Sequence, residues 1–336
     1  MFMNGSRRGR LDMSPGSSED TPWLSIVLPT HQGERWLEDT LDSLVAQSDK
    51  GFECLVVDSS PDENTIGLAK NYADRLTLRF FKRVDLKHWR SKTNFGFSMA
   101  RAPHVCMLHQ DDFWLPQRSA VLREWLVAAP DISVHLHPSY VVDINGRRLG
   151  VWGCPLPASG TPIPRQILIE RLLVQNFVSV PAPVIRRDSF LEVGGLDESL
   201  WYTGDWDLYL KLARAGAFAY HREALTCFRI HGSSLTMSGS RQVSDFESQM
   251  QSVLRSHISA LPAARRNAVR SKALVSLRVN ACLAAATNDP APLKHLINAF
   301  GAVLGLGPVK MREYLFESRL FERLIPRLRA RMAGNL

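Results

Sequence analysis

The sequence predicts an α/β protein in which a mostly parallel sheet is flanked by helices and followed by a helical C-terminal region. Short apolar runs rich in β-branched residues alternate with segments of helical period from residue 23 onward. Such alternation is typical of right-handed β-α-β crossovers. Beyond residue 238 only helical patterns remain. We therefore expect a disordered tail at residues 1–22, an α/β domain at 23–240 and a helical region at 241–336.

The first half of the chain contains four predicted strands with helices between them. The strands are short apolar runs, at residues 23–30, 52–60, 76–81 and 104–109. Apolar side chains recur at helical intervals in the intervening segments, at residues 33–47, 63–75 and 90–102. The order of these elements predicts neighbouring parallel strands.

The remainder of the chain is predicted with less regular elements. An Asn145-Gly146 pair predicts a hairpin within residues 133–150. Two helices are expected, one at 165–175 and one that ends at Gly216, followed by a last strand and turn at 224–234. The C-terminal helices are expected to break at Pro262, at 288–292 and at 305–308.

Charge and cysteine content narrow the class of protein. The net charge is +8, but the segment from residue 261 onward holds 13 basic and 4 acidic residues, so the rest is close to neutral. This predicts an acidic partner for the C-terminal segment alone. No nucleic-acid-binding motif accompanies the charge. Five scattered cysteines and an N-terminus without an apolar signal segment predict reduced thiols in a cytoplasm.

Polar groups follow three of the predicted strands. They are Pro29-Thr30-His31, Asp58-Ser59-Ser60 and the run from His109 to Asp112. Ligands of open parallel sheets bind beyond the carboxyl ends of the strands. The turn after the first strand has one glycine, and neither the dinucleotide-binding fingerprint nor a phosphate-binding P-loop is present. Any nucleotide is therefore bound by other means.

Two acidic pairs are open to two interpretations each. Asp111 and Asp112 predict a divalent-cation site, although a solvated turn would also explain them. Asp205 and Asp207 begin a helix, where they either complement its dipole beside a Thr203 cap or supply a general base. Trp206 between them is expected in the core.

Cationic side chains near these acids are also candidates. Arg229 and His231 are expected on one face of a strand, where Arg229 would hold a phosphate and His231 a metal ion. Packing alone would equally explain the histidine. Lys87, Arg90 and Lys92 are expected to be a solvated helix start.

In their order and spacing, five segments resemble family 2 glycosyltransferases of the GT-A fold. They cover about residues 23–236 and read SIVLPTHQGERWLEDTLDSLVAQ, ECLVVDSSPDENT, NFGFSMARAPHVCMLHQDDFWLP, VGGLDESLWYTGDWDLYLKLARAG and FRIHGSSLT. The resemblance implies a hexosyltransferase-type enzyme that inverts configuration and uses Mg²⁺ or Mn²⁺ with a nucleotide-sugar donor. The motif of processive synthases is missing, so single or few additions are expected.

The resemblance also assigns roles residue by residue. Asp205 would be the catalytic base, and Asp112 and His231 would bind the metal ion. The nucleotide-sugar would contact Pro29, Thr30, Glu34, Asp58, Asn94, Asp111 and Arg229. This chain departs from the family pattern at His109 and Gly204, where acidic residues are usual. The change at Gly204 leaves open a second hypothesis, a non-catalytic relative that binds nucleotide-sugars or glycans.

The segment 310–332 spaces apolar residues at helical intervals with arginines between them. Its apolar face would either pack on the domain or lie against an anionic membrane surface. Pro326 speaks against one unbroken helix. From the resemblance we expect a glycan or lipid-linked acceptor, a role in cell-surface polysaccharide or lipopolysaccharide assembly, and peripheral contact with the inner face of the plasma membrane.

Overall fold

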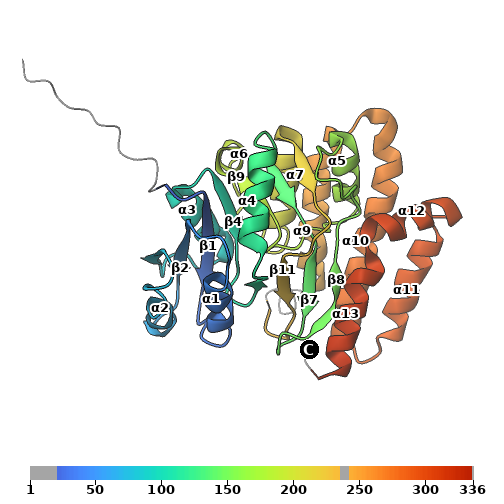
Figure 1. Ribbon diagram of the computed structural model, residues 1–336. Helices are drawn as coiled ribbons and strands as arrows, with labels where there is room; N and C mark the ends of the chain where they lie inside the picture. Colours follow the sequence, from blue (N-terminus) through green and yellow to red (C-terminus); the bar gives the residue numbers. More distant parts are fainter. Residues whose placement is uncertain (1–20, 235–241, 335–336) are drawn as a thin grey trace, which may run out of the picture.

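The computed structural model describes residues 21–234 and 242–334, and Figure 1 shows the arrangement of their elements. The predicted N-terminal tail lies almost wholly outside these residues. A seven-stranded sheet with the order β10-β6-β9-β4-β1-β2-β3 forms the centre of the α/β part. Its strands are β1 (Leu24–Thr30), β2 (Phe52–Asp58), β3 (Leu78–Lys82), β4 (His104–Met107), β6 (Val134–Leu136), β9 (Val184–Arg186) and β10 (Phe218–Tyr220).

The predicted parallel sheet is confirmed, with one exception. All neighbouring strands run parallel except at β9, which is antiparallel to both β4 and β6. Every residue of β1 and β2 is buried, because helices cover both faces of the sheet. The register of β1 against β2 pairs Thr30 with Asp58, so these two polar residues end adjacent strands side by side.

Helices cover the sheet in two layers, and each layer packs into its own core. One face of the sheet carries Ile26, Val56 and Leu108 toward α1 (Leu37–Val45), α2 (Asn64–Lys70) and α4 (Arg118–Ala128). The other face carries Val27 and Met107 into a larger core. That core includes residues of α3 (Trp89–Met99), α5 (Arg165–Val174), α6 (Arg187–Glu192) and α7 (Gly204–Ala215).

A second sheet of four strands lies beside the first, with the order β5-β11-β7-β8. Its strands are β5 (Phe113–Trp114), β11 (Thr226–Arg229), β7 (Ser139–Val142) and β8 (Arg148–Trp152). The β7–β8 pair confirms the predicted hairpin at Asn145-Gly146. Because β5 pairs with β11, the chain directly after Asp112 lies beside Arg229. The sequence did not predict β5.

The C-terminal part is helical, as predicted. It comprises α9 (Val243–His257), a 3₁₀ turn (Ile258–Ala260), α10 (Ala263–Asn288), α11 (Leu293–Leu304), α12 (Pro308–Ser318) and α13 (Leu320–Met332). The three predicted breaks are confirmed. A fourth break occurs at Arg319, whose φ of 50° is left-handed, and Pro326 lies inside α13 rather than ending it.

The C-terminal helix α13 packs along β8, as Figure 1 shows. A Cβ placed on Gly150 of β8 would lie 2.8 Å from Cγ of Pro326, so the glycine admits the proline ring. Residues of α9, α10 and α12 belong to the same large core as α5 and α7. In the described part of the chain, no helix is both long and apolar enough to cross a bilayer.

Candidate active site

A cleft of about 660 Å³ opens beyond the carboxyl ends of β1 and β4. Five of the residues predicted from the sequence line it: Pro29, Asp111, Asp205, Arg229 and His231. The other predicted residues do not reach the cleft wall: Thr30, Glu34, Asp58, Asn94 and Asp112. The cleft thus brings together the two acidic segments, which are about 90 residues apart in the sequence.

Asp58 lies behind the cleft floor with all of its contacts made inside the protein. Thr30 Oγ1 and Ser60 Oγ donate to its Oδ1 at 2.9 and 2.7 Å, and Lys82 Nζ lies 2.9 Å from Oδ2. Burial raises the pKa of Asp58, but these hydrogen bonds outweigh it and the net shift is downward. Asp58 is therefore a charged anchor between strand ends, and its contact with a nucleotide base stays a prediction.

Lys92 and Arg90 correct the expectation of a solvated helix start. Both side chains are buried. Nζ of Lys92 donates to the Thr30 carbonyl at 2.7 Å and to Ser59 Oγ at 2.9 Å, and burial lowers its pKa to about 8. Lys92 also lines the cleft and so offers it a cation. The sequence carried no signal for this, because a lysine in a first helical turn is usually solvated.

Arg90 packs against Gly204, the residue at which the resemblance leads one to expect an acid. Its guanidinium donates to the carbonyl oxygens of Trp201 and Glu198 at 2.8 and 3.2 Å. A Cβ on Gly204 would lie 2.8 Å from Cδ of Arg90, so a larger side chain would require Arg90 to shift. Asn94 has a similar bridging role, because its side chain exchanges hydrogen bonds with the backbone of Leu196.

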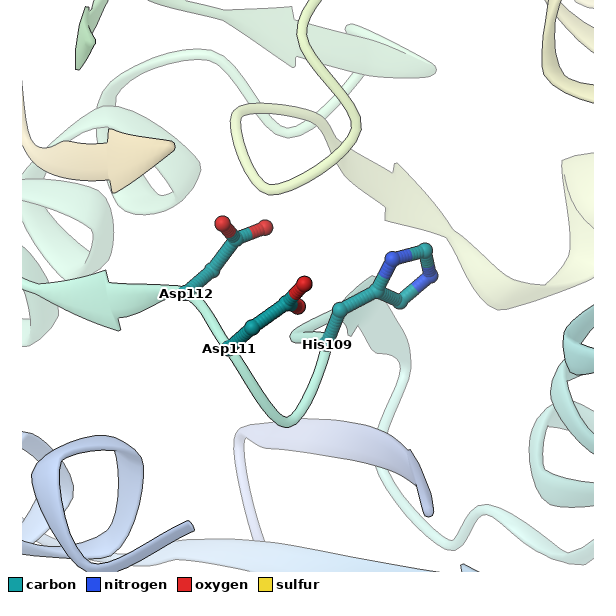
Figure 2. Close-up of side chains that lie close together, drawn as sticks. All are labelled: His109, Asp111 and Asp112. Atoms are coloured by element: carbon teal, nitrogen blue, oxygen red, sulfur yellow. The ribbon is translucent and has the colours of Figure 1, made fainter. Parts of the chain in front are cut away.

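The loop between β4 and β5 gathers His109, Asp111 and Asp112. Figure 2 shows their side chains on the same side of that loop. One ligand atom from each residue lies within 4.8 Å of the others. His109 Nε2 and Asp112 Oδ2 are buried and have no hydrogen-bond partner among the described residues. Oxygen and imidazole ligands with free lone pairs fit Mg²⁺ or Mn²⁺, so the cluster passes the chemical test for such an ion.

The pKa values of Asp111 and Asp112 are shifted in opposite directions. Burial raises the pKa of Asp112 well above its usual value, and the nearby Asp111 adds to this. Burial also acts on Asp111, but its hydrogen bond with His231 and the nearby His109 lower the pKa overall. The bond joins His231 Nε2 to Asp111 Oδ2 at 2.8 Å. A bound divalent cation would remove the repulsion between the aspartates.

Arg229 holds the His109–Asp112 loop in place through hydrogen bonds. Its backbone N–H donates to Asp112 Oδ1 at 2.9 Å, and its guanidinium donates to the Asp111 carbonyl at 2.8 Å and to Asp39 at 2.8 Å. The side chain fixes the loop that carries Asp111 and Asp112, and its predicted phosphate contact stays a prediction. His231 follows β11 rather than lying on it, which corrects the expectation of a shared strand.

Asp205 lies in the first turn of α7 and lines the same cleft as Asp111. Asn176 Nδ2 donates to its Oδ2 at 2.9 Å, and burial raises its pKa to about 6. Thr203 precedes the helix but its hydroxyl makes no capping bond, so the expected cap is absent. Asp207 instead pairs with His257 and Lys211, and Trp206 is in the core as expected. Of the two aspartates, Asp205 alone lines the cleft.

Comparison with known proteins agrees with this geometry. The model of the family described as Glycosyl transferase family 2 matches residues 25–190. An uncharacterized glycosyltransferase of Rickettsia prowazekii is 24% identical over 228 residues, which are 68% of this chain and 70% of the relative.

Two solved structures share the fold. Staphylococcus aureus TarS 1-349 with UDP-GlcNAc is 17% identical, with a TM-score of 0.60 over 93% of this chain and 92% of that one. The mannosyltransferase PcManGT of Pyrobaculum calidifontis, solved with GDP-Man and Mn²⁺, is 17% identical, with a TM-score of 0.55 over 92% and 87%. Against a longer TarS chain, this protein spans 50% of the length.

The sheet has the GT-A fold that the two solved structures share. Together with the family match and the named relatives, it makes this protein a glycosyltransferase. Residues 25–190 form a domain of glycosyltransferase family 2, and relatives that match about two thirds of this chain are named glycosyltransferases.

Proposed function

We propose that this enzyme moves a sugar from a nucleotide-diphosphate donor to a hydroxyl group of a glycan or lipid-linked acceptor, with inversion at the anomeric carbon. One observation supports this proposal most. Asp205 and the His109-Asp111-Asp112 cluster lie far apart in the sequence, yet they line or border the same cleft. A base on one side and a cation site on the other are the two parts that such a displacement needs. The donors UDP-GlcNAc and GDP-Man of the structural neighbours suggest the donor class.

In this mechanism Asp205 acts as the general base. Its carboxylate accepts the proton of the acceptor hydroxyl while that oxygen attacks the anomeric carbon and the bond to the diphosphate breaks. Asn176 orients the carboxylate through Oδ2. A Mg²⁺ or Mn²⁺ ion held by Asp111, Asp112, His109 and His231 would offset the charge of the departing diphosphate. Lys92 adds a positive charge at the cleft floor.

Two substitutions with one control test the proposal. Asp112→Ala should abolish Mn²⁺-dependent binding of UDP-, GDP- and dTDP-sugars, because it removes a buried ligand oxygen. Asp205→Asn should keep donor binding and lose transfer by at least about a hundredfold. Asp131→Asn, an exposed aspartate outside the cleft, is the matched control. Full transfer by Asp205→Asn would refute the base assignment, and donor binding without any transfer by the unmodified chain would favour the non-catalytic hypothesis.

The C-terminal helices support peripheral contact with an anionic membrane surface. Large apolar side chains are exposed on α11 (Leu293, Leu296, Ile297, Phe300 and Leu304) and on α13 (Phe321, Ile325, Leu328 and Met332). Exposed cations accompany them at Lys294, Lys310, Arg312 and Arg331. An apolar face with adjoining cations matches a bilayer with anionic headgroups. We place the enzyme in the cytoplasm at the inner face of the plasma membrane, in cell-surface polysaccharide or lipopolysaccharide assembly.

A further inference from the structure

Helix α13 directs two arginines toward the cleft and exposes several large apolar side chains. Arg323 and Arg327, one turn apart, line the same cleft as Asp205. Phe321, Ile325 and Leu328 on the same helix are exposed. The helix also buries Pro326 and Ala330 against the domain, so its packing alone does not require two arginines on the cleft side. The inward arginines therefore point to a function in the cleft.

Among the residues that the structure describes, the two arginines have no acidic partner. Arg323 donates to Asn280 Oδ1 at 2.6 Å and to the Ser318 carbonyl at 3.4 Å. Arg327 donates to the Arg323 carbonyl at 2.8 Å, and its guanidinium lies 5.7 Å from the Trp152 ring centre. Within residues 21–234 and 242–334, no carboxylate lies within 4.0 Å of either guanidinium. Two neighbouring cations without a counterion are unfavourable unless an anion binds between them.

Arg323 and Arg327 share their surroundings with Asp205, the proposed base, rather than with the His109–Asp112 loop. Burial raises the pKa of the Tyr202 phenol, and its charge environment includes Arg323, Arg327 and Asp205 together. Tyr202 also lines the cleft. Trp152, another lining residue, has a buried indole N–H without a partner among the described side chains and backbone groups. This end of the cleft therefore offers several hydrogen-bond donors and a net positive charge.

We propose that Arg323 and Arg327 form an anion subsite that binds a phosphate group of the acceptor and holds the acceptor hydroxyl near Asp205. Two guanidinium groups provide parallel N–H donors that match phosphate oxygens. The role of this subsite in acceptor binding rests on the proposed transfer reaction, whereas the binding of an anion does not. The subsite assigns an acceptor class, phosphate-containing, that the family resemblance leaves open.

The test measures the binding of inorganic phosphate to the full chain by titration calorimetry. Arg327→Gln should weaken the affinity at least about tenfold, because a charge-assisted hydrogen bond is lost. Arg327→Lys should recover part of it. Arg329→Gln, two residues along the same helix and exposed, loses the same charge outside the cleft and should bind as the unmodified protein does. Arg327 is the primary target because Arg323 also bonds to Asn280 and Ser318.

A competition arm separates the acceptor's phosphate from the donor's diphosphate. Phosphate should still bind the arginine pair when the protein is saturated with UDP or GDP and Mn²⁺. Loss of phosphate binding under those conditions would assign the arginines to the donor and overturn the proposal. Equal affinity in Arg327→Gln, or no phosphate binding by the unmodified chain, would also overturn it. Normal phosphate binding without donor turnover would count against the proposed transfer reaction and support the anion subsite.

Discussion

At the scale of single residues, the protonation of Asp205 is the property with the clearest consequence. Its carboxyl group is buried in the cleft wall, and its pKa of about 6 lies above the usual value for an aspartate. A general base must be deprotonated, so transfer should be full above this pKa and fall tenfold per pH unit well below it. A flat profile of kcat between about pH 5 and 8 would contradict the assignment.

Asn176 offers a direct test of how that pKa is set. Its amide donates to Asp205 Oδ2 and thereby lowers the pKa against the effect of burial. In Asn176→Ala the midpoint of the pH–kcat profile should move upward by about one unit. Asn298→Ala, at an exposed residue of α11, should leave the midpoint unchanged. A downward shift in Asn176→Ala would be inconsistent with this role.

His109 is one of the two residues at which this chain departs from the family pattern, and we propose that it is a metal ligand. Its ligand nitrogen lies with the carboxylates of Asp111 and Asp112. His109→Ala should therefore weaken Mn²⁺ binding about tenfold. Calorimetry, or the electron paramagnetic resonance signal of free Mn²⁺, measures this affinity. His88→Ala removes another imidazole that lines the cleft but lies outside the metal cluster, and it should have no such effect. Equal losses in both variants would rule out a specific ligand role.

At the scale of elements, the docking of α13 on β8 depends on one glycine. Gly150 leaves room for Pro326, whose ring is rigid and cannot turn aside. Gly150→Ala should lower the free energy of unfolding by about 1–3 kcal/mol through overpacking. Gly67→Ala, at an open helical position of α2, should raise it by up to about 1 kcal/mol. Chemical denaturation measures both, and stabilisation by Gly150→Ala would show that α13 is not held as described.

Helix α13 both packs on β8 and contributes to the cleft lining. Because α13 supplies Arg323 and Arg327 to the cleft lining, a shift of this helix should also disturb the proposed anion subsite. The sequence showed an amphipathic segment with arginines and left two environments open for its apolar face. The structure separates the arginines: Arg323 and Arg327 turn inward, whereas Arg329 and Arg331 are exposed.

At the scale of the whole molecule, the exposed apolar side chains gather on the C-terminal helices. Ile297→Ser and Phe300→Ser together should reduce binding to anionic vesicles several-fold, because each removes apolar area that a bilayer would bury. Leu191→Ser, at an exposed leucine of α6, is the matched control. Vesicle co-sedimentation at low salt measures the effect. Undiminished binding of the double variant would exclude this surface as the membrane contact.

The sequence by itself determined the alternating strands and helices of the first half of the chain up to β4, the helical C-terminal part and the positions of the polar strand ends. Alternating buried strands and amphipathic helices have periods that can be read along the chain, and parallel crossovers then place Thr30, Asp58 and the His109–Asp112 run at one edge. The family resemblance supplied the proposed roles of Asp205 and of the His109–Asp112 loop. These are local patterns or motifs, so they did not require knowledge of distant contacts.

Only the tertiary structure decided which side chains face the cleft and which are held behind it. The burial of Lys92, the filling of the space at Gly204 by Arg90 and the contribution of α13 all depend on contacts between segments far apart in the sequence. Charged residues in a helix have the same local pattern whether they face solvent or a cavity. Their environment is fixed by packing, and the sequence therefore left these residues unassigned.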